Sequence, residues 1–181
     1  MQNKKTMLIT QAAVIAAMYA ALTYAQNLLL PGTTSMAVQF RVSEALNVLA
    51  LFTPAAIPGL TLGCVISNLY NIGSGLPLDM IFGSIATLCA TVCMFMLRKV
   101  CVKGYPLIAM FMPALWNGLI VGWEIEAFYI EGDFEPVGFL TQGGFVALGE
   151  LAVMFILGTA LYYALKKSNI DKRMRNKGTS A

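Results

Sequence analysis

The chain consists of long apolar runs separated by short breaks that are rich in proline, glycine or charged residues. An apolar helix of about 20 residues is long enough to cross the roughly 30 Å hydrocarbon core of a bilayer. The runs predict six transmembrane helices, at residues 7–30, 36–52, 55–72, 79–97, 106–123 and 144–165, followed by a basic tail at 166–181. The pattern therefore predicts an all-α membrane protein in which residues 1–181 form a single integral membrane domain.

The run at 36–52 is the shortest of the six and contains Gln39, Arg41 and Glu44, so it either crosses the membrane or lies in its interface. The distribution of charge favours a crossing. Six spans place the basic loop "RKVCVK" and the basic tail on the same side as the N-terminus, and the acidic loop after the fifth span on the other. Lys and Arg prefer the cytoplasmic side. We therefore expect six transmembrane helices with both termini in the cytoplasm.

The composition agrees with a membrane protein and excludes some functions. Hydrophobic residues make up 58% of the 181 residues and charged residues 12%, whereas about 25% of the residues in a typical soluble domain are charged. The segments between the spans are too short for a nucleotide-binding domain, and the chain has no G-x-x-x-x-G-K-[ST] loop and no histidine. We therefore expect neither ATP hydrolysis nor a metal site in this chain.

Polar residues gather in the outer halves of the predicted spans, while the inner halves are filled with apolar residues. An intramembrane charge usually faces the interior of a helix bundle or a water-filled cavity, and often marks a functional site. The pattern predicts a polar cup on the outer side above an apolar plug. The candidate substrate-binding residues are Arg41, Glu44, Asn68, Asp79, Trp116, Asn117, Glu124 and Glu150.

Several of these residues also have structural interpretations. Arg41 and Glu44 are three residues apart and could pair with each other, Asp79 could stabilise a helix N-terminus, and Trp116 could belong to an interfacial aromatic belt. Glu150 has no cation near it in sequence and is the hardest to explain in this way. A proton-coupled carrier or a membrane-embedded enzyme would also use such carboxylates. However, the inner halves hold no ionisable residue, and no H-E-x-x-H or G-x-S-x-G motif is present.

The first predicted helix carries two adjacent rows of small residues. Ala12, Ala16 and Ala20 form one row, and Ala13, Ala17 and Ala21 form the other. Small residues at this spacing let a second helix approach closely in lipid. The rows indicate either packing inside the bundle or a face on which another protein docks.

The stretch "VQFRVSEALNVLALFTPAAIPGL", followed by "GCVISNLYNIGSGLPLDMIFGSIATL", resembles the queuosine-precursor transporter (QueT) family. This family belongs to the substrate-binding (S) components of energy-coupling factor (ECF) transporters, multi-pass proteins of the bacterial cell membrane. The resemblance implies an S-component-like bundle that works with a coupling protein (EcfT) and two ATPases (EcfA and EcfA′). ATP and Mg²⁺ would then be bound by the ATPases, with no cofactor in this chain. The docking residues that it implies are Ala12, Ala13, Ala16 and Ala17.

The ligand that the resemblance implies is a 7-deazaguanine, such as queuine or a preQ base, and no nucleic acid partner is expected. A guanine-like edge offers adjacent donors to a carboxylate, an oxygen acceptor to an arginine or asparagine, and a flat face for stacking. An aminomethyl substituent would add a cation for a second carboxylate. An S component of the same architecture that binds another vitamin remains the alternative.

Overall fold

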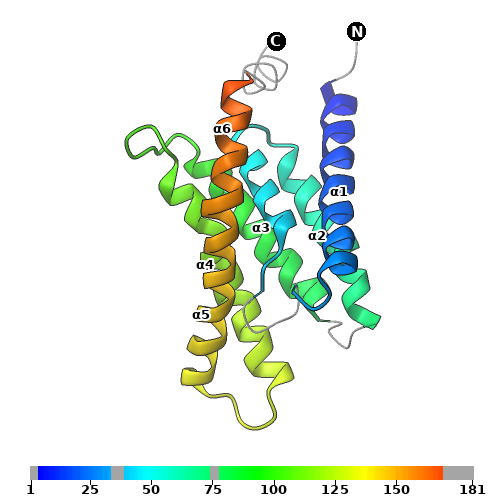
Figure 1. Ribbon diagram of the computed structural model, residues 1–181, viewed down its shortest axis with the longest axis vertical. Coiled ribbons are helices and arrows are strands. Elements are labelled where there is room, and N and C mark those ends of the chain that lie inside the picture. Colours follow the sequence, from blue (N-terminus) through cyan, green and yellow to red (C-terminus); the bar gives the residue numbers. More distant parts are fainter. Residues whose placement is uncertain (1–3, 34–38, 74–77, 169–181) are drawn as a thin grey trace.

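The computed structural model describes residues 4–33, 39–73 and 78–168, with side chains except at 70–73. The described chain is helical apart from one isolated β-bridge between Val102 and Tyr105. Its elements are α1 (Lys4–Leu29), the 3-10 helix η1 (Val42–Leu51), α2 (Ala56–Gly73), α3 (Asp79–Leu97), α4 (Leu107–Glu124), the π-helix η2 (Ile125–Tyr129), α5 (Pro136–Val153), the π-helix η3 (Met154–Gly158) and α6 (Thr159–Lys167). Because η2 continues α4, and η3 joins α5 to α6, these elements form six helical segments (Figure 1). The all-helical fold that the sequence predicts is confirmed.

Four of the six segments are long and apolar enough to cross a membrane. They are Lys4–Leu29, Asp79–Leu97, Leu107–Tyr129 and Pro136–Lys167, whereas the apolar stretches Val42–Leu51 and Ala56–Leu69 are shorter. The last helical segment begins at Pro136 rather than near residue 144, because proline fits the first turn of a helix, where its missing N–H is not needed. The predicted fifth span likewise ends later than expected, because α4 continues into η2 and reaches Tyr129 rather than residue 123.

The two ends of the bundle differ in charge. The start of α1 and the end of α6 lie at the same end, together with the connection from α3 to α4, whereas the connection from η2 to α5 lies at the opposite end (Figure 1). We call the first the basic end, because it carries Lys4, Lys5, Arg98, Lys99, Lys103, Lys166 and Lys167. We call the other the acidic end, because it carries Glu131, Asp133 and Glu135. This arrangement is what an even number of crossings requires.

The second predicted span is a 3-10 helix enclosed by the other segments. Runs of 3-10 helix longer than three or four residues are uncommon, and η1 is ten residues long. Every residue from Ser43 to Leu51 is buried, and η1 contacts all five other helical segments. At about 2 Å per residue it rises roughly 20 Å, which is less than the thickness of a bilayer core. The segment is therefore a central element of the bundle and does not lie along its surface.

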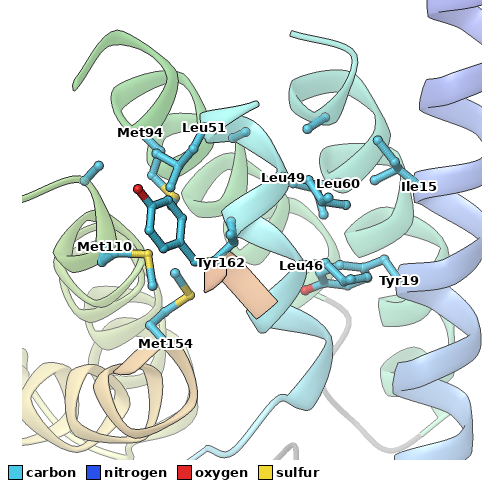
Figure 2. Packing of buried hydrophobic residues seen from close by; sticks show 14 of the residues in the cluster. Ile15, Tyr19, Leu46, Leu49, Leu51, Leu60, Met94, Met110, Met154 and Tyr162 are labelled. Atoms are coloured by element: carbon cyan, nitrogen blue, oxygen red, sulfur yellow. The ribbon is translucent and has the colours of Figure 1, made fainter. Parts of the chain in front are cut away.

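An apolar core fills the half of the bundle nearer the basic end. It comes from the middle of α1, most of η1, the first half of α2 and the end of α3, with the start of α4 and the η3–α6 region closing it. Met94, Met110 and Met154 surround Tyr162, and Leu46 lies beside Tyr19 (Figure 2). Flexible methionine side chains fill irregular gaps between helices. The core leaves the opposite half of the bundle to the polar side chains.

Glycines let α4 and α5 pack backbone against backbone. A Cβ atom on Gly143 would overlap the carbonyl oxygen of Gly118, and one on Gly122 would overlap Gly143 itself. Small residues at helix crossings are the usual means of close packing in membranes. The crossing fixes the heights of the polar side chains that the two helices carry.

We expect Gly143→Ala to destabilise the protein by about 1–3 kcal/mol, because the methyl group would force these two backbones apart. The neighbouring Gly144 is a matched control, since a Cβ there meets no atom within 4 Å. Gly144→Ala should be neutral or stabilise the helix by about 0.5–1 kcal/mol. Thermal unfolding of the purified proteins in detergent compares the two variants. Equal midpoints would show that the crossing tolerates a side chain.

Candidate ligand-binding site

Arg41 lies where an extended segment enters η1, and α1 holds that segment in place. The side-chain amide of Gln26 donates to the carbonyl oxygen of Phe40, and its oxygen accepts from the N–H of Val42 at 2.8 Å. The backbone on both sides of Arg41 is thus fixed to α1. The arginine side chain is 5% exposed and is directed into the bundle.

The guanidinium group of Arg41 forms a buried ion pair with Asp79, the first residue of α3. Asn68 of α2 donates to the backbone oxygen of the same aspartate at 2.9 Å. Gly83 leaves room for this arrangement, because a Cβ there would lie 3.0 Å from Asp79 Oδ1 and 3.2 Å from Asn68 Nδ2. Removing one partner of such a pair leaves a buried charge uncompensated. The pair therefore ties α2, α3 and η1 together.

Glu44 does not form an ion pair with Arg41, although the spacing of the two residues would allow one. Its carboxylate instead accepts hydrogen bonds from the Tyr19 hydroxyl of α1 and, at 2.5 Å, from the Asn47 amide. The side chain is 1% exposed. Two donors satisfy a buried carboxylate without a formal partner charge. Glu44 thus has both of its oxygens occupied by protein groups.

Glu124 ends α4 close to the Arg41–Asp79 pair. It is 1% exposed, and it interacts electrostatically with Asp79 and Arg41. Neither carboxylate oxygen has a partner at hydrogen-bond distance among the described residues, although the Tyr129 hydroxyl lies close to the group. That hydroxyl accepts from the N–H of Leu78 at 3.2 Å, which joins η2 to the start of α3. Glu124 therefore has accepting capacity left for a ligand.

Glu150 lies deeper in the bundle, on α5. The helix approaches the extended segment so closely that a Cβ on Gly149 would overlap the backbone of Gln39. Glu150 is 4% exposed, interacts electrostatically with Glu44 and Arg41, and has an Oε2 atom without a hydrogen-bond partner within the described chain. Its position beside η1 thus comes from backbone packing, and the free oxygen is available to a ligand.

Asn117 contributes a further unused donor. It is 3% exposed, and its Nδ2 atom has no hydrogen-bond partner among the residues that the structure describes. It lies seven residues before Glu124 on the same buried face of α4. Buried polar groups are normally paired. An unpaired amide on this face is what a site built for a polar ligand contains.

We call the buried polar side chains of this half of the bundle the polar cluster: Tyr19, Arg41, Glu44, Asn68, Asp79, Asn117, Glu124 and Glu150. It extends from the acidic end toward the middle of the bundle. Seven of these residues were predicted from the sequence. Tyr19 was missed, because a tyrosine in an alanine-rich helix reads as a core residue. Tyr129, which lies beside the cluster near Glu124, was not predicted either, because its segment was expected to be a loop.

Trp116, also predicted to bind substrate, points elsewhere. Its indole N–H donates to the Cys93 sulfur on α3 at 3.3 Å, and the side chain is half-buried. Trp116 and Asn117 are consecutive on α4, so they lie about 100° apart around the helix. The indole therefore packs against α3, and we leave Trp116 out of the polar cluster.

The structure separates the two alanine rows on α1. The row with Ala12 and Ala16 packs against α2, where a Cβ on Gly59 would lie 2.8 Å from the Ala12 carbonyl oxygen and one on Gly63 would lie 3.0 Å from that of Ala16. The row with Ala13 and Ala17 is exposed. A single small-residue pattern thus covers both an internal contact and an open face.

An apolar groove of about 380 Å³ lies beside the exposed row, toward the basic end. It is formed by the first turns of α1 and the beginning of α2, and its lining residues are Leu8, Ile9, Ala12, Ala13, Pro54, Ala55, Pro58 and Leu62. The groove lies at the opposite end of α1 from Gln26, which bonds the backbone beside Arg41 of the polar cluster. A partner seated in it would leave the candidate ligand site unobstructed.

Comparison with known proteins agrees with this architecture. Residues 9–167 match the family described as QueT transporter. The chain is 31% identical over 170 residues to a protein from Lactococcus lactis subsp. cremoris (strain MG1363) that bears the name "Queuosine precursor transporter QueT". The match covers 86% of this chain and 90% of that protein, whereas no solved structure is significantly similar. With a family match over most of its length and helices suited to a bilayer, the chain is a multi-pass membrane protein that belongs to the QueT transporter family.

Proposed function

We propose that this protein is the substrate-binding component of an ECF-type importer and binds a queuosine precursor with a 7-deazaguanine base, such as queuine or a preQ base. The observation that carries the proposal is the polar cluster, in which Asn117 and Glu150 are buried with unused hydrogen-bonding atoms. The relative from Lactococcus lactis is named for transport of such precursors. With the basic end in the cytoplasm, the cluster belongs to the outer half, where an importer captures its ligand.

The chemistry of the base matches the groups that the cluster leaves open. A guanine-like edge carries adjacent N–H donors, which a carboxylate such as Glu150 accepts in bidentate fashion. Its O6 atom is an acceptor for the Asn117 amide or for the remaining N–H groups of Arg41, whose Nε has no partner among the described residues. A site with buried polar groups discriminates strongly against ligands that leave those groups unpaired.

Calorimetric titration of the purified protein tests the proposal. Queuine and 7-aminomethyl-7-deazaguanine should bind tightly, guanine more weakly, and riboflavin and biotin not at all. Tight binding of a vitamin with no response to any deazaguanine would overturn the proposal and point to an S component for that vitamin.

Energy for import would come from partner proteins. We place the docking of the coupling protein (EcfT) on the exposed row of α1 and the apolar groove beside it, at the end that faces the ATPases (EcfA and EcfA′). ATP and Mg²⁺ belong to those ATPases. Small residues give a partner helix close access in a bilayer, where packing rather than hydrophobicity drives association. Uptake by this chain alone in proteoliposomes, driven by a proton gradient, would instead indicate a proton-coupled carrier.

We expect Ala17→Trp to abolish transport in cells that supply the partner proteins while ligand affinity stays unchanged. The indole would hold the coupling helix away from the exposed row, and packing lost there is not replaced by lipid. Met18→Trp is the matched control, since Met18 is 46% exposed at the same depth but lies about 100° further around the helix. Ala16→Trp is unsuitable, because Ala16 is buried against α2. Normal transport by Ala17→Trp would remove this face from the docking surface.

A further inference from the structure

The polar cluster holds fewer positive charges than its carboxyl groups require. Arg41 is its one basic side chain, whereas Glu44, Asp79, Glu124 and Glu150 supply four carboxyl groups. The other described lysines and arginines lie at the basic end, on the far side of the apolar core. An ionised carboxylate away from water is costly unless a cation or several donors receive it. The balance of charge therefore favours a ligand that brings a positive charge.

Two of the four carboxyl groups are already satisfied by the protein. Asp79 is paired with Arg41, and Glu44 accepts from Tyr19 and Asn47. The remaining two, Glu124 and Glu150, have oxygens without a hydrogen-bond partner in the described chain. These two are the groups that a ligand would contact.

Glu124 and Glu150 lie at different heights in the bundle. From the crossing at Gly143, α5 continues toward the basic end to reach Glu150, while α4 continues from Gly122 toward the acidic end to reach Glu124. At 1.5 Å per residue their backbones are roughly 15 Å apart along the bundle. A flat bicyclic molecule with a short substituent is long enough to reach both carboxyl groups once the two side chains extend toward each other.

The surroundings of the two carboxyl groups differ. Glu150 lies beside Glu44, whose oxygens are occupied. Glu124 lies beside Asp79 and the Tyr129 hydroxyl, whose oxygen already accepts from Leu78. The Tyr129 hydroxyl therefore still has its own O–H to donate toward Glu124. The two oxygens of Glu124 at the outer height can therefore accept from an ammonium group, which donates up to three hydrogen bonds.

We propose that Glu124 is a specificity-determining residue that selects a positively charged ligand, an inference that rests on the proposed function. A deazaguanine whose 7-substituent ends in a protonated amine binds with the ammonium group against Glu124 and its base edge toward Glu150. An uncharged analogue such as 7-cyano-7-deazaguanine has nearly the same shape but leaves Glu124 without a positively charged partner. Hydrogen bonds in which the donor or the acceptor is ionised are about twice as strong as those between neutral groups.

Titration of the unmodified protein with both compounds gives the first test. The aminomethyl compound should bind roughly tenfold to a hundredfold more tightly than the cyano compound. In Glu124→Gln the affinity for the aminomethyl compound should fall toward that for the cyano compound, whose own affinity should hardly change. Glu126→Gln is the matched control, because it removes the same charge two residues away. Glu126 lies outside the cluster and accepts from the N–H of Glu135.

The outcomes separate this inference from the proposed function. Failure of both compounds to bind would overturn the proposed function. Equal binding of both to the unmodified protein, or equal weakening of both by Glu124→Gln, would overturn the role of Glu124 while the proposed function stands. If Glu124→Gln does not fold, Glu124→Asp keeps the charge and should keep the preference. Loss of the preference in a folded Glu124→Asp variant that still binds the cyano compound normally would overturn the proposal that the charge of Glu124 selects the ligand.

Discussion

Replacing Arg41 with glutamine should lower the free energy of unfolding by about 3–5 kcal/mol and abolish ligand binding. The substitution leaves Asp79 as an uncompensated buried charge at the junction of η1, α2 and α3. It also removes the single cation that offsets the carboxyl groups of the cluster. Thermal unfolding in detergent measures the first effect and calorimetric titration the second. A folded Arg41→Gln variant with the original midpoint would show that the ion pair adds nothing to stability.

A double variant distinguishes loss of the pair from loss of the arginine itself. Arg41→Gln combined with Asp79→Asn removes both charges, so it should recover part of the stability that Arg41→Gln loses. Lys99→Gln is the control for net charge, because Lys99 is exposed at the basic end and should give an unchanged midpoint. A double variant less stable than Arg41→Gln alone would contradict a direct pairing.

Replacing Glu150 with glutamine should weaken ligand binding by roughly tenfold to more than a hundredfold. Glutamine keeps the shape of the side chain but exchanges one acceptor for a donor, which then faces the donors of the guanine-like edge. Each mismatched buried polar group costs about 1–3 kcal/mol. Close packing of Gly149 against Gln39 fixes the backbone that carries this side chain. Calorimetric titration with 7-aminomethyl-7-deazaguanine measures the loss.

The Glu150 variant should fold, because removing an intramembrane charge does not oppose insertion. Glu131→Gln, in the exposed connection at the acidic end, makes the same chemical change outside the cluster and should bind normally. Unchanged affinity in folded Glu150→Gln would assign recognition of the base edge to another member of the cluster. Unlike Glu124→Gln, the Glu150 variant should lose affinity for the charged and the uncharged compound alike.

Much of the fold could be predicted because the bilayer limits the possibilities. An apolar run that enters lipid must satisfy its backbone internally, so each run implies a helix. Proline and glycine residues then indicated where several of these apolar runs end. The helix ends were predicted less well, since Pro136 begins a helical segment that reads in sequence as a loop. The 3-10 form of η1, which the five other segments enclose, was not predicted.

Most members of the polar cluster could also be identified from the sequence. Charges and amides in apolar runs are rare, and Glu150 in particular has no local partner that would explain it. The ion-pair and hydrogen-bond partners of these residues were not predictable from the sequence. Local spacing allows Arg41 to bond Glu44, yet it pairs with Asp79, 38 residues away in sequence. Glu44 instead accepts from Tyr19, 25 residues before it.

The alanine rows show the same division. Periodicity alone determined that α1 has two faces of small residues, but only tertiary packing decided that Ala16 lies against Gly63 of α2 and that Ala17 is exposed. Hydrophobic periodicity is a local property, written into residues three and four positions apart. Contacts between helices depend on the rotation and relative height of each helix, which the whole bundle sets at once. The sequence by itself therefore determined the class of protein and the set of functional candidates, while the tertiary structure decided their partners.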